Sequence, residues 1–469
     1  MHGGLNFLLQ FATAIAVLIA AAYLPGRLLV RASGLQVSRL EHAAASWVSG
    51  IAAFTLTAWI SLWSNLPFLV WILAFSAGAL EIILERRGRA RRLPVRLPGE
   101  PEPEPLGAHA GFWVLMVLGA AGQAWFTVRS GWWGSEGMVL HAWHAHDAPW
   151  HIFNLHQLGR VFPPDFPGFA GRTLQNYHMF SDLLWGMLLR LVPLDPWHVY
   201  FRIAPWFYSC GLSLGTYVIA LTWSGKRPVA LLAVALTLFT SNFGYVLPML
   251  LGPERYFYGD SMLWVQSPAL TIFNPGVSAS YALFLTGGWA LVRWLREGRT
   301  GTLLLLALMW GVLPGFKVYP AILALAALAA AGIVRLAAAR ETRLLAALGA
   351  VLPVFLAVFL PANLNAPSLI RWLPGFNLAT MLTAPDRMAL LPAAELKLLF
   401  AQAPVATAVL IGLLIPVFLV GNLGVRSLGL GLLAKAACRP GRGDPFLLFL
   451  AVLGGGALAA PVLFVQRGV

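Results

Sequence analysis

Charged side chains are scarce in this chain, and cysteine is almost absent. Asp, Glu, Lys and Arg make up 11% of the 469 residues, whereas hydrophobic residues make up 59%. Ordinary soluble domains are about 25% charged and about 45–50% apolar. This composition, with a mean hydropathy of +0.75, excludes a soluble globular domain. The two cysteines, Cys210 and Cys438, cannot form a disulfide framework.

The few charges are unbalanced, with 32 Lys and Arg against 18 Asp and Glu and a net charge of +14. In a soluble protein this excess would suggest a nucleic-acid partner. Here the arginines gather in short segments between apolar runs, which is typical of cytoplasmic loops in membrane proteins. We therefore expect a protein integral to a cell membrane, the cytoplasmic membrane of a prokaryote, with the lipid bilayer as a partner and no nucleic acid.

Long apolar runs determine the expected fold class. A helix needs about 20 apolar residues to cross a hydrocarbon core of ~30 Å, and runs of about this length recur along the chain. The sequence thus predicts an all-α, polytopic transmembrane protein with about 12 spans. The expected spans are 7–29, 43–64, 68–84, 111–128, 198–223, 228–250, 277–295, 302–316, 319–336, 344–360, 398–420 and 446–465.

A basic and proline-rich segment divides the chain. Arginines crowd residues 86–96, and the sequence PGEPEPEP follows, which is too polar and stiff to pack into a core. We expect a three-helix membrane segment over 1–85, a cytoplasmic linker over 86–107 and a transmembrane core over 108–469. The chain ends soon after its last apolar run, which suggests a C-terminally truncated protein.

The basic cluster at 86–96 belongs in the cytoplasm, which places three long loops, 129–197, 251–276 and 361–397, on the outer face. The segment 180–194 decides this topology. If it crossed the membrane, the basic loops that follow it would face outward. As an amphipathic helix at the interface, it leaves them in the cytoplasm. We favour the second interpretation, which makes the outer face the active one.

One carboxylate lies among histidines in the first outer loop, in the sequence HAWHAHDAPWHIFNLH. Asp147 at a membrane boundary could act as a general base towards a hydroxyl group or could ligate a metal. The structural alternative is an N-cap, with the helix beginning near Ala148 and Pro149.

The histidines beside Asp147 raise the question of a metal site. His144, Asp147 and His151 are spaced i, i+3 and i+7, so an unbroken helix would place them on one face as weak metal candidates. Pro149 is expected to interrupt that helix. A solvated loop of His and Trp with no ligand role is the competing interpretation.

Three residues in other segments are candidates for the same site. Asp260 in the second outer loop could supply a second acid, or could simply balance Arg255 at the surface. Lys317 lies between two apolar runs at the outer boundary, where a cation suits a phosphate on a lipid. A snorkelling lysine is the alternative there. Arg202, at the outer start of a helix, is interpreted in the same way as Lys317.

The whole arrangement resembles the GT-C superfamily of membrane glycosyltransferases, and glycosyltransferase family 39 within it, over about residues 108–465. Members place a catalytic acid and an amphipathic helix in the first outer loop, an arginine at the start of the next helix, and another acid in the second outer loop. The matching features are Asp147 in HAHDAPWHI, the segment 180–194, Arg202 in FRIAP and Asp260 in YFYGDSM. The chain departs from the pattern at Ala148, where members often carry a second acid, and in its extra N-terminal helices.

The resemblance implies an inverting glycosyltransferase. It would move a hexosyl or pentosyl group from a polyprenyl-phosphate donor to a glycan, lipid or protein acceptor at the extracytoplasmic face. Asp147 would position or deprotonate the acceptor, with Asp260 as the second catalytic residue. The substrate-binding residues would be His146, His151, His178, Arg202 and Lys317. This chemistry requires no cofactor, although a divalent cation can take part.

A transporter or flippase of a lipid-linked or polar solute is the main alternative. It predicts charges near the bilayer midplane and paired internal repeats, whereas the charges of this chain lie at the ends of apolar runs. A non-catalytic scaffold or sensor is the third interpretation.

Overall fold

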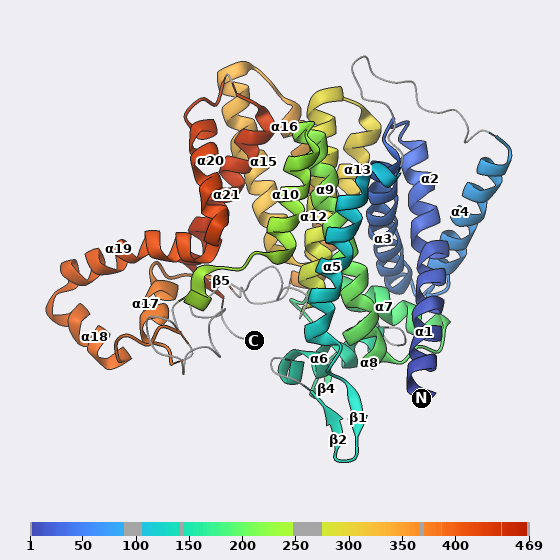
Figure 1. Cartoon of the computed structure of the whole chain (residues 1–469), viewed down its shortest axis with the longest axis horizontal. Helices are drawn as coiled ribbons and strands as arrows, with labels where there is room; N and C mark the ends of the chain where they lie inside the picture. The colour runs from blue at the N-terminus through green and yellow to red at the C-terminus, as the bar shows by residue number, and fades with distance from the viewer. Residues whose placement is uncertain are drawn as a thin grey trace. The chain divides into compact units, whose positions relative to one another are not determined.

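The computed structural model describes residues 2–88, 106–140, 144–158, 160, 162–246, 274–364, 370–385, 387–441 and 443–466. Within these ranges the protein is helical apart from three two-stranded antiparallel ribbons (Figure 1). Six of the described helical segments are long and apolar enough to cross a membrane. The expected all-α membrane protein is confirmed at this level, and the total number of spans stays a prediction.

The chain forms two compact units. The first contains Met1–Ala235, Ile272–Leu325 and Thr342–Ala366, and the second contains Leu236–Thr271, Ala326–Glu341 and Pro367–Val469. The helices before the proline-rich linker therefore belong to the same unit as those that follow it. Within α15 (Val318–Ala339) the chain passes from the first unit to the second.

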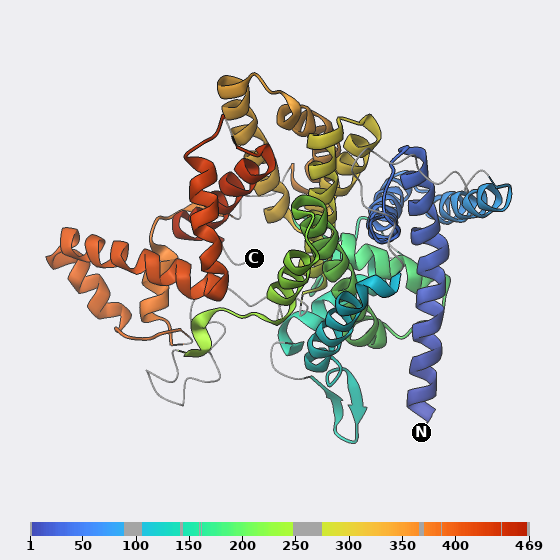
Figure 2. The same ribbon diagram turned by 45° about the horizontal axis from the view of Figure 1, so that its top comes forward.

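The first unit is a bundle of helices (Figures 1 and 2). It contains α1 (His2–Leu18), η1 (Ile19–Tyr23), α2 (Leu24–Ala32), α3 (Arg39–Trp63), α4 (Leu69–Arg86), η3 (Leu106–His109), α5 (Ala110–Thr127), α6 (His144–Leu158), α7 (Phe180–Leu191), α8 (Pro196–His198), η4 (Val199–Ile203), α9 (Ala204–Ser224), most of α10 (Arg227–Phe239), α12 (Pro275–Glu297), α13 (Thr300–Gly311), α14 (Leu313–Phe316) and α16 (Arg343–Asn363). Two ribbons join this unit, β1 (Trp132–Gly134) with β2 (Gly137–Val139) and β3 (Asp165–Phe166) with β4 (Phe169–Thr173).

Small residues bring α9 and α12 together at the centre of this unit. A Cβ added to Gly215 would lie 2.9 Å from Thr286 Oγ1, and one added to Gly211 would lie 3.2 Å from Ala282 Cβ. Helices in lipid gain little from hydrophobic burial against each other, so close backbone approach through small side chains is a principal source of their association.

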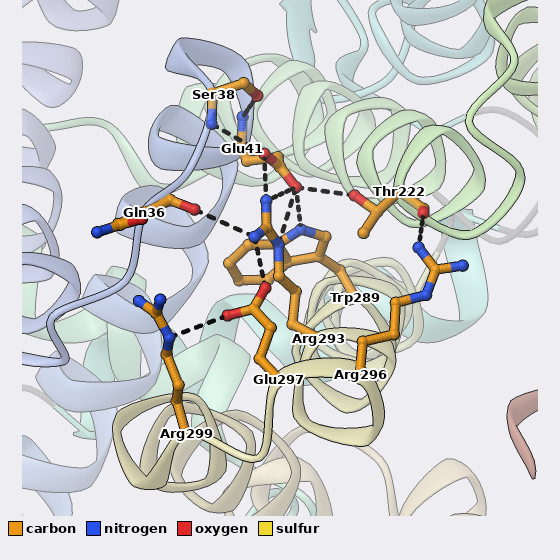
Figure 3. Close-up of polar contacts among 9 residues, drawn as sticks. All are labelled: Gln36, Ser38, Glu41, Thr222, Trp289, Arg293, Arg296, Glu297 and Arg299. Atoms are coloured by element: carbon orange, nitrogen blue, oxygen red, sulfur yellow. Dashed lines mark hydrogen bonds and ion pairs between the residues drawn. The ribbon is translucent and has the colours of Figure 1, made fainter. Parts of the chain in front are cut away.

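Charged residues join three helices at one end of the bundle (Figure 3). Arg293 of α12 donates from Nη2 to both carboxylate oxygens of Glu41, at 2.9 and 3.0 Å. Glu41 also accepts from Trp289 Nε1 and from the Thr222 hydroxyl on α9, each at 2.8 Å. Ser38 caps α3 in a capping box with Glu41. The N-terminal segment is thus tied to α9 and α12 through buried polar groups.

The loops expected to be cytoplasmic meet at this same end. Arg296 donates to the carbonyl oxygen of Trp223 at 2.8 Å, and Arg299 donates to that of Gly34 at 3.2 Å. Trp294 Nε1 donates to the carbonyl oxygen of Arg343 at 2.9 Å. The basic segments near 226, 296–299 and 343 therefore lie together beside the loop at Gly34, as the non-crossing interpretation of segment 180–194 requires.

Segment 180–194 differs from its expected form. Its helix α7 has 12 residues, about 18 Å of rise, which is too short to cross a bilayer. However, every residue from Phe180 to Leu188 is buried, because α7 packs against α3, α6, α12 and α14. The helix is thus more buried than a helix lying on a membrane surface would be, with exposure only at its C-terminal end, at Arg190 and Leu191. Its position at the interface stays a prediction, and Asp182 has a partner inside the protein.

The second unit contains η5 (Phe243–Val246), α17 (Phe376–Thr383), α18 (Ala393–Gln402), α19 (Pro404–Leu423), η8 (Gly424–Gly429), α20 (Leu430–Ala437) and α21 (Pro445–Leu463), with a ribbon of β5 (Ile370–Trp372) and β6 (Phe464–Gln466). The expected span 398–420 is divided between α18 and α19. Ala403 leaves the helical conformation, with φ −141° and ψ 67°. Pro404 explains the break, because a proline disfavours the helical conformation of the residue before it.

Candidate functional site

The candidate site lies at the end of the first unit opposite the basic loops. Gly276 at the start of α12 packs beside His178 and Phe316, whereas Arg293 and Arg296 lie near the other end of the same helix. Five elements supply the side chains: α6, the irregular segment before α7, the first turn of α7, the π-helical turn η4, and the junction between α14 and α15.

Helix α6 begins earlier than expected. It starts at His144, so Asp147 lies in its first turn and does not cap it, and Pro149 lies inside the helix. Near the start of a helix, a proline removes one intrahelical hydrogen bond without ending the helix. Asp147 is exposed, and His151, one turn later on the same helix, is buried with 4% exposure.

His151 pairs with an acid that the sequence interpretation assigned no role in the site. Its Nδ1 lies 3.0 Å from both carboxylate oxygens of Asp182, which is 2% exposed. Tyr177 places its hydroxyl 3.2 Å from His151 Nδ1 and 3.5 Å from Asp182 Oδ2. Asn154 Nδ2 also lies 3.5 Å from Asp182 Oδ2. A buried carboxylate is thus surrounded by polar hydrogens, as burial of a charge demands.

A π-helical turn completes the surroundings of His151. The turn η4 carries Tyr200, whose ring stacks on that of His151 with centroids 5.5 Å apart and planes at 28°. Such turns widen a helix by one residue and often occur at functional sites. Here the widened turn is the one that carries the stacking tyrosine.

Lys317 lies beside His178 in the same region. Lys317 Nζ is 2.9 Å from His178 Nε2. Burial and the charge of Lys317, with a smaller influence from His151, lower the pKa of His178 well below its usual value, so the ring is neutral and Nε2 accepts from the ammonium. Burial lowers the pKa of Lys317 to about 8, and the negative charges of Asp147 and Asp182 oppose that decrease.

Two glycines make this junction possible. A Cβ at Gly315 would overlap the ring of Phe180, and one at Gly276 would lie 2.9 Å from the carbonyl oxygen of Phe316. Phe316 in turn packs edge-on against Phe180, with ring centroids 5.7 Å apart. The absence of side chains at both glycines lets α14 approach α7 and α12, which brings Lys317 to His178.

The acids, the cation and the tyrosines form one electrostatic cluster. Burial, together with the charges of Asp182 and Asp147, raises the pKa of Tyr177 well above its usual value. The same two carboxylates act on Lys317. The cluster therefore combines an exposed carboxylate, a partly buried ammonium and an imidazole held by a second carboxylate. These groups can bind an oxyanion and handle the proton of a hydroxyl group.

Arg202 lies in a different place from this cluster. It is 2% exposed, and its Nη2 donates to the carbonyl oxygen of Ser130 at 2.8 Å. Its Nη1 lies 2.8 Å from His198 Nδ1, and its guanidinium stacks over Trp132 at 3.6 Å from the ring centroid. Arg202 thus anchors the β1–β2 ribbon, and the structure does not bring it to Lys317.

Several expected site residues lie outside what the structure describes. Asp260 and Arg255 fall in residues 247–273, and the side chains of His144 and His146 are also outside the described set. Among the side chains that are described, no three His, Cys, Asp or Glu residues come close enough to hold a metal ion. Of the three weak metal candidates, only Asp147 and His151 can be placed, and His151 is engaged with Asp182.

Comparison with protein-family models, with curated proteins and with solved structures finds no match for this chain.

Proposed function

We propose that the protein is a membrane glycosyltransferase that moves a sugar from a polyprenyl-phosphate donor to an acceptor hydroxyl at the outer face. The observation that carries this proposal is the position of Lys317. A partly buried ammonium contacts the neutral ring of His178 and experiences the charges of Asp147 and Asp182, at the end of the bundle opposite the basic loops.

The chemistry of sugar transfer from a lipid phosphate needs little covalent work by the protein. The phosphate that departs carries negative charge, which a fixed cation in a site of low polarity stabilises. Lys317 has two N–H groups left after its contact with His178, and these suit phosphate oxygens. Asp147, exposed in the first turn of α6, binds the acceptor hydroxyl. Direct displacement at the sugar carbon then inverts its configuration.

The test uses the full chain in lipid nanodiscs, with radiolabelled polyprenyl-phosphate hexoses and pentoses and a panel of glycan, lipid and peptide acceptors. We expect wild-type protein to release polyprenyl phosphate and label one acceptor class. Lys317→Ala and Asp147→Asn should each lower the rate by about 100-fold or more. Lys226→Ala is the matched control, since Lys226 is exposed at the opposite end of the unit.

Two outcomes would contradict the proposal. Turnover that survives Asp147→Asn and Lys317→Ala would remove both residues from the site. Movement of an intact labelled lipid across liposome membranes, without any cleaved product, would favour the transporter alternative.

A further inference from the structure

The pairing of His151 with Asp182 determines which ring nitrogen carries a proton. Nδ1 lies 3.0 Å from both oxygens of the carboxylate. A carboxylate accepts hydrogen bonds, so Nδ1 must be the donor and Nε2 carries the lone pair of the neutral ring. Nε2 makes no hydrogen bond to any residue that the structure describes. The carboxylate therefore selects the tautomer of the neutral ring in which Nε2 can accept a proton.

Asp182 is itself fixed. It lies in the first turn of α7, where the helix N-terminus favours a negative charge. The Tyr177 hydroxyl and the Asn154 amide approach Oδ2, each at 3.5 Å. A proton acceptor oriented by a hydrogen-bonded third group is the arrangement that activates hydroxyl nucleophiles in enzymes.

The position of His151 relative to the other site groups suits that role. Asp147 precedes it by four residues, so the two side chains lie on the same side of α6, one turn apart. His178, which contacts Lys317, is close enough to His151 for the two rings to influence each other electrostatically. A hydroxyl held at Asp147 would thus be near His151, with the phosphate at Lys317.

We infer that His151 is the catalytic base of the transfer reaction and that Asp182 is its positioning residue, an inference that rests on the proposed function. The acceptor O–H gives its proton to His151 Nε2. The acceptor oxygen forms a bond to the anomeric carbon while the bond from that carbon to the phosphate oxygen breaks. The electron pair leaves on the polyprenyl phosphate, whose charge Lys317 receives.

The burial of His151 agrees with separate roles for the two residues, with His151 as the base and Asp147 as the residue that binds the acceptor. His151 is 4% exposed, whereas Asp147 is exposed to solvent. In a transferase, water competes with the acceptor hydroxyl for the donor sugar. A base that is shielded from bulk water does not activate water molecules, so it does not promote hydrolysis of the donor. An exposed carboxylate suits the binding of an acceptor that arrives from solution.

The test separates a base from a merely structural histidine. His151→Asn keeps an amide N–H that can donate to Asp182 in place of Nδ1, but it removes Nε2. We expect this variant to melt near the wild-type temperature and to lose about 100-fold to 10,000-fold in kcat, with the KM for donor nearly unchanged. His151→Ala should regain part of its activity with added imidazole. Asp182→Asn should lower kcat by at least about tenfold, because it disfavours the Nδ1–H form.

His156→Ala is the matched control, since His156 is an exposed histidine on the same helix and should keep full activity. If His151→Asn keeps at least half of the wild-type kcat while Lys317→Ala is inactive, the inference is overturned and the proposed function stands. If His151→Asn and His151→Ala both unfold, Asp182→Asn decides the question. A fall in kcat of at least about tenfold at wild-type KM and melting temperature supports the positioning role of Asp182. A wild-type kcat for this variant overturns the inference. If the wild-type protein transfers no sugar, the proposed function fails and the inference fails with it.

Discussion

Arg293 binds both carboxylate oxygens of Glu41, so one buried ion pair joins α12 to the N-terminal turn of α3 (Figure 3). The side chains are 8% and 9% exposed. Removing one partner of such a pair leaves a buried charge without compensation, at a cost of about 3–5 kcal/mol. We expect Arg293→Met to lower thermal stability in detergent strongly. The double variant Glu41→Leu with Arg293→Met should recover part of the loss, because Glu297, which Arg293 contacts at 2.6 Å, lacks this partner in both variants.

Arg299→Met is the control for this pair. Arg299 also contacts an acid, Glu297, at 3.5 Å, but its side chain is 31% exposed, so its loss should change stability by less than about 1 kcal/mol. Equal losses of stability for Arg293→Met and Arg299→Met would show that the pair of Arg293 with Glu41 stabilises the N-terminal helices no more than an exposed ion pair does.

The pKa of Lys317 predicts how activity should change with pH. Because burial lowers that pKa from 10.5 to about 8, the ammonium is charged below pH 8 and neutral above it. We expect kcat/KM for the phosphate donor to fall about tenfold for each pH unit above that value, since the free enzyme loses its cation. Lys317→Arg should keep its charge and show no such fall up to about pH 10. A profile that is flat from pH 7 to 10 in the wild type would contradict the phosphate role.

Gly315 should tolerate no side chain. Gly315→Ala places a methyl group against the Phe180 ring, so α14 must move away from α7 and carry Lys317 with it. We expect a loss of about 1–3 kcal/mol in stability and a clear fall in turnover. Gly349→Ala is the matched control, because a Cβ at Gly349 meets nothing within 4 Å. Phe180→Leu should partly rescue Gly315→Ala, and the absence of any rescue would argue against this contact as the cause.

Arg202 should behave as a structural residue. Arg202→Ala removes the contacts to Ser130 and Trp132, and we expect lower thermal stability and faster proteolysis of the β1–β2 ribbon. When it is measured on the folded fraction of the variant, the KM for the donor should stay within about threefold of the wild-type value. Arg129→Ala, which removes a more exposed arginine stacked on Trp125, is the control. A tenfold rise in donor KM at unchanged stability would show that Arg202 binds the donor phosphate after all.

The sidedness of the membrane can be checked with cysteines. Cys438 is exposed and lies in a loop that the charge pattern assigns to the cytoplasm. A membrane-impermeant maleimide added to intact cells should therefore leave Cys438 unlabelled. It should label His156→Cys in a Cys438→Ala background, since His156 is exposed on α6, in the loop that the charge pattern assigns to the outer face. The reverse pattern would invert the topology.

The sequence predicted the helical bundle better than the site. Apolar runs and basic loops depend on local composition. The break before Pro404 also has a local cause, but the expected span 398–420 runs across it and is wrong there. The partners of Asp182 and Arg202 are not. His151 and Asp182 are 31 residues apart, and Arg202 and Ser130 are 72 residues apart. Tertiary packing alone brings these pairs together, so the sequence predicts neither the partner of Asp182 nor the structural contacts of Arg202, which it assigns to a phosphate site.

Helix α7 is too short to span a bilayer and is enclosed by α3, α6, α12 and α14. The carboxylate of Asp182 is therefore positioned by the packing of four neighbouring helices. A methyl group added or removed along those helices would displace Asp182 and, with it, the imidazole of His151. If His151 is the proposed base, turnover would therefore depend on how well this part of the bundle is packed.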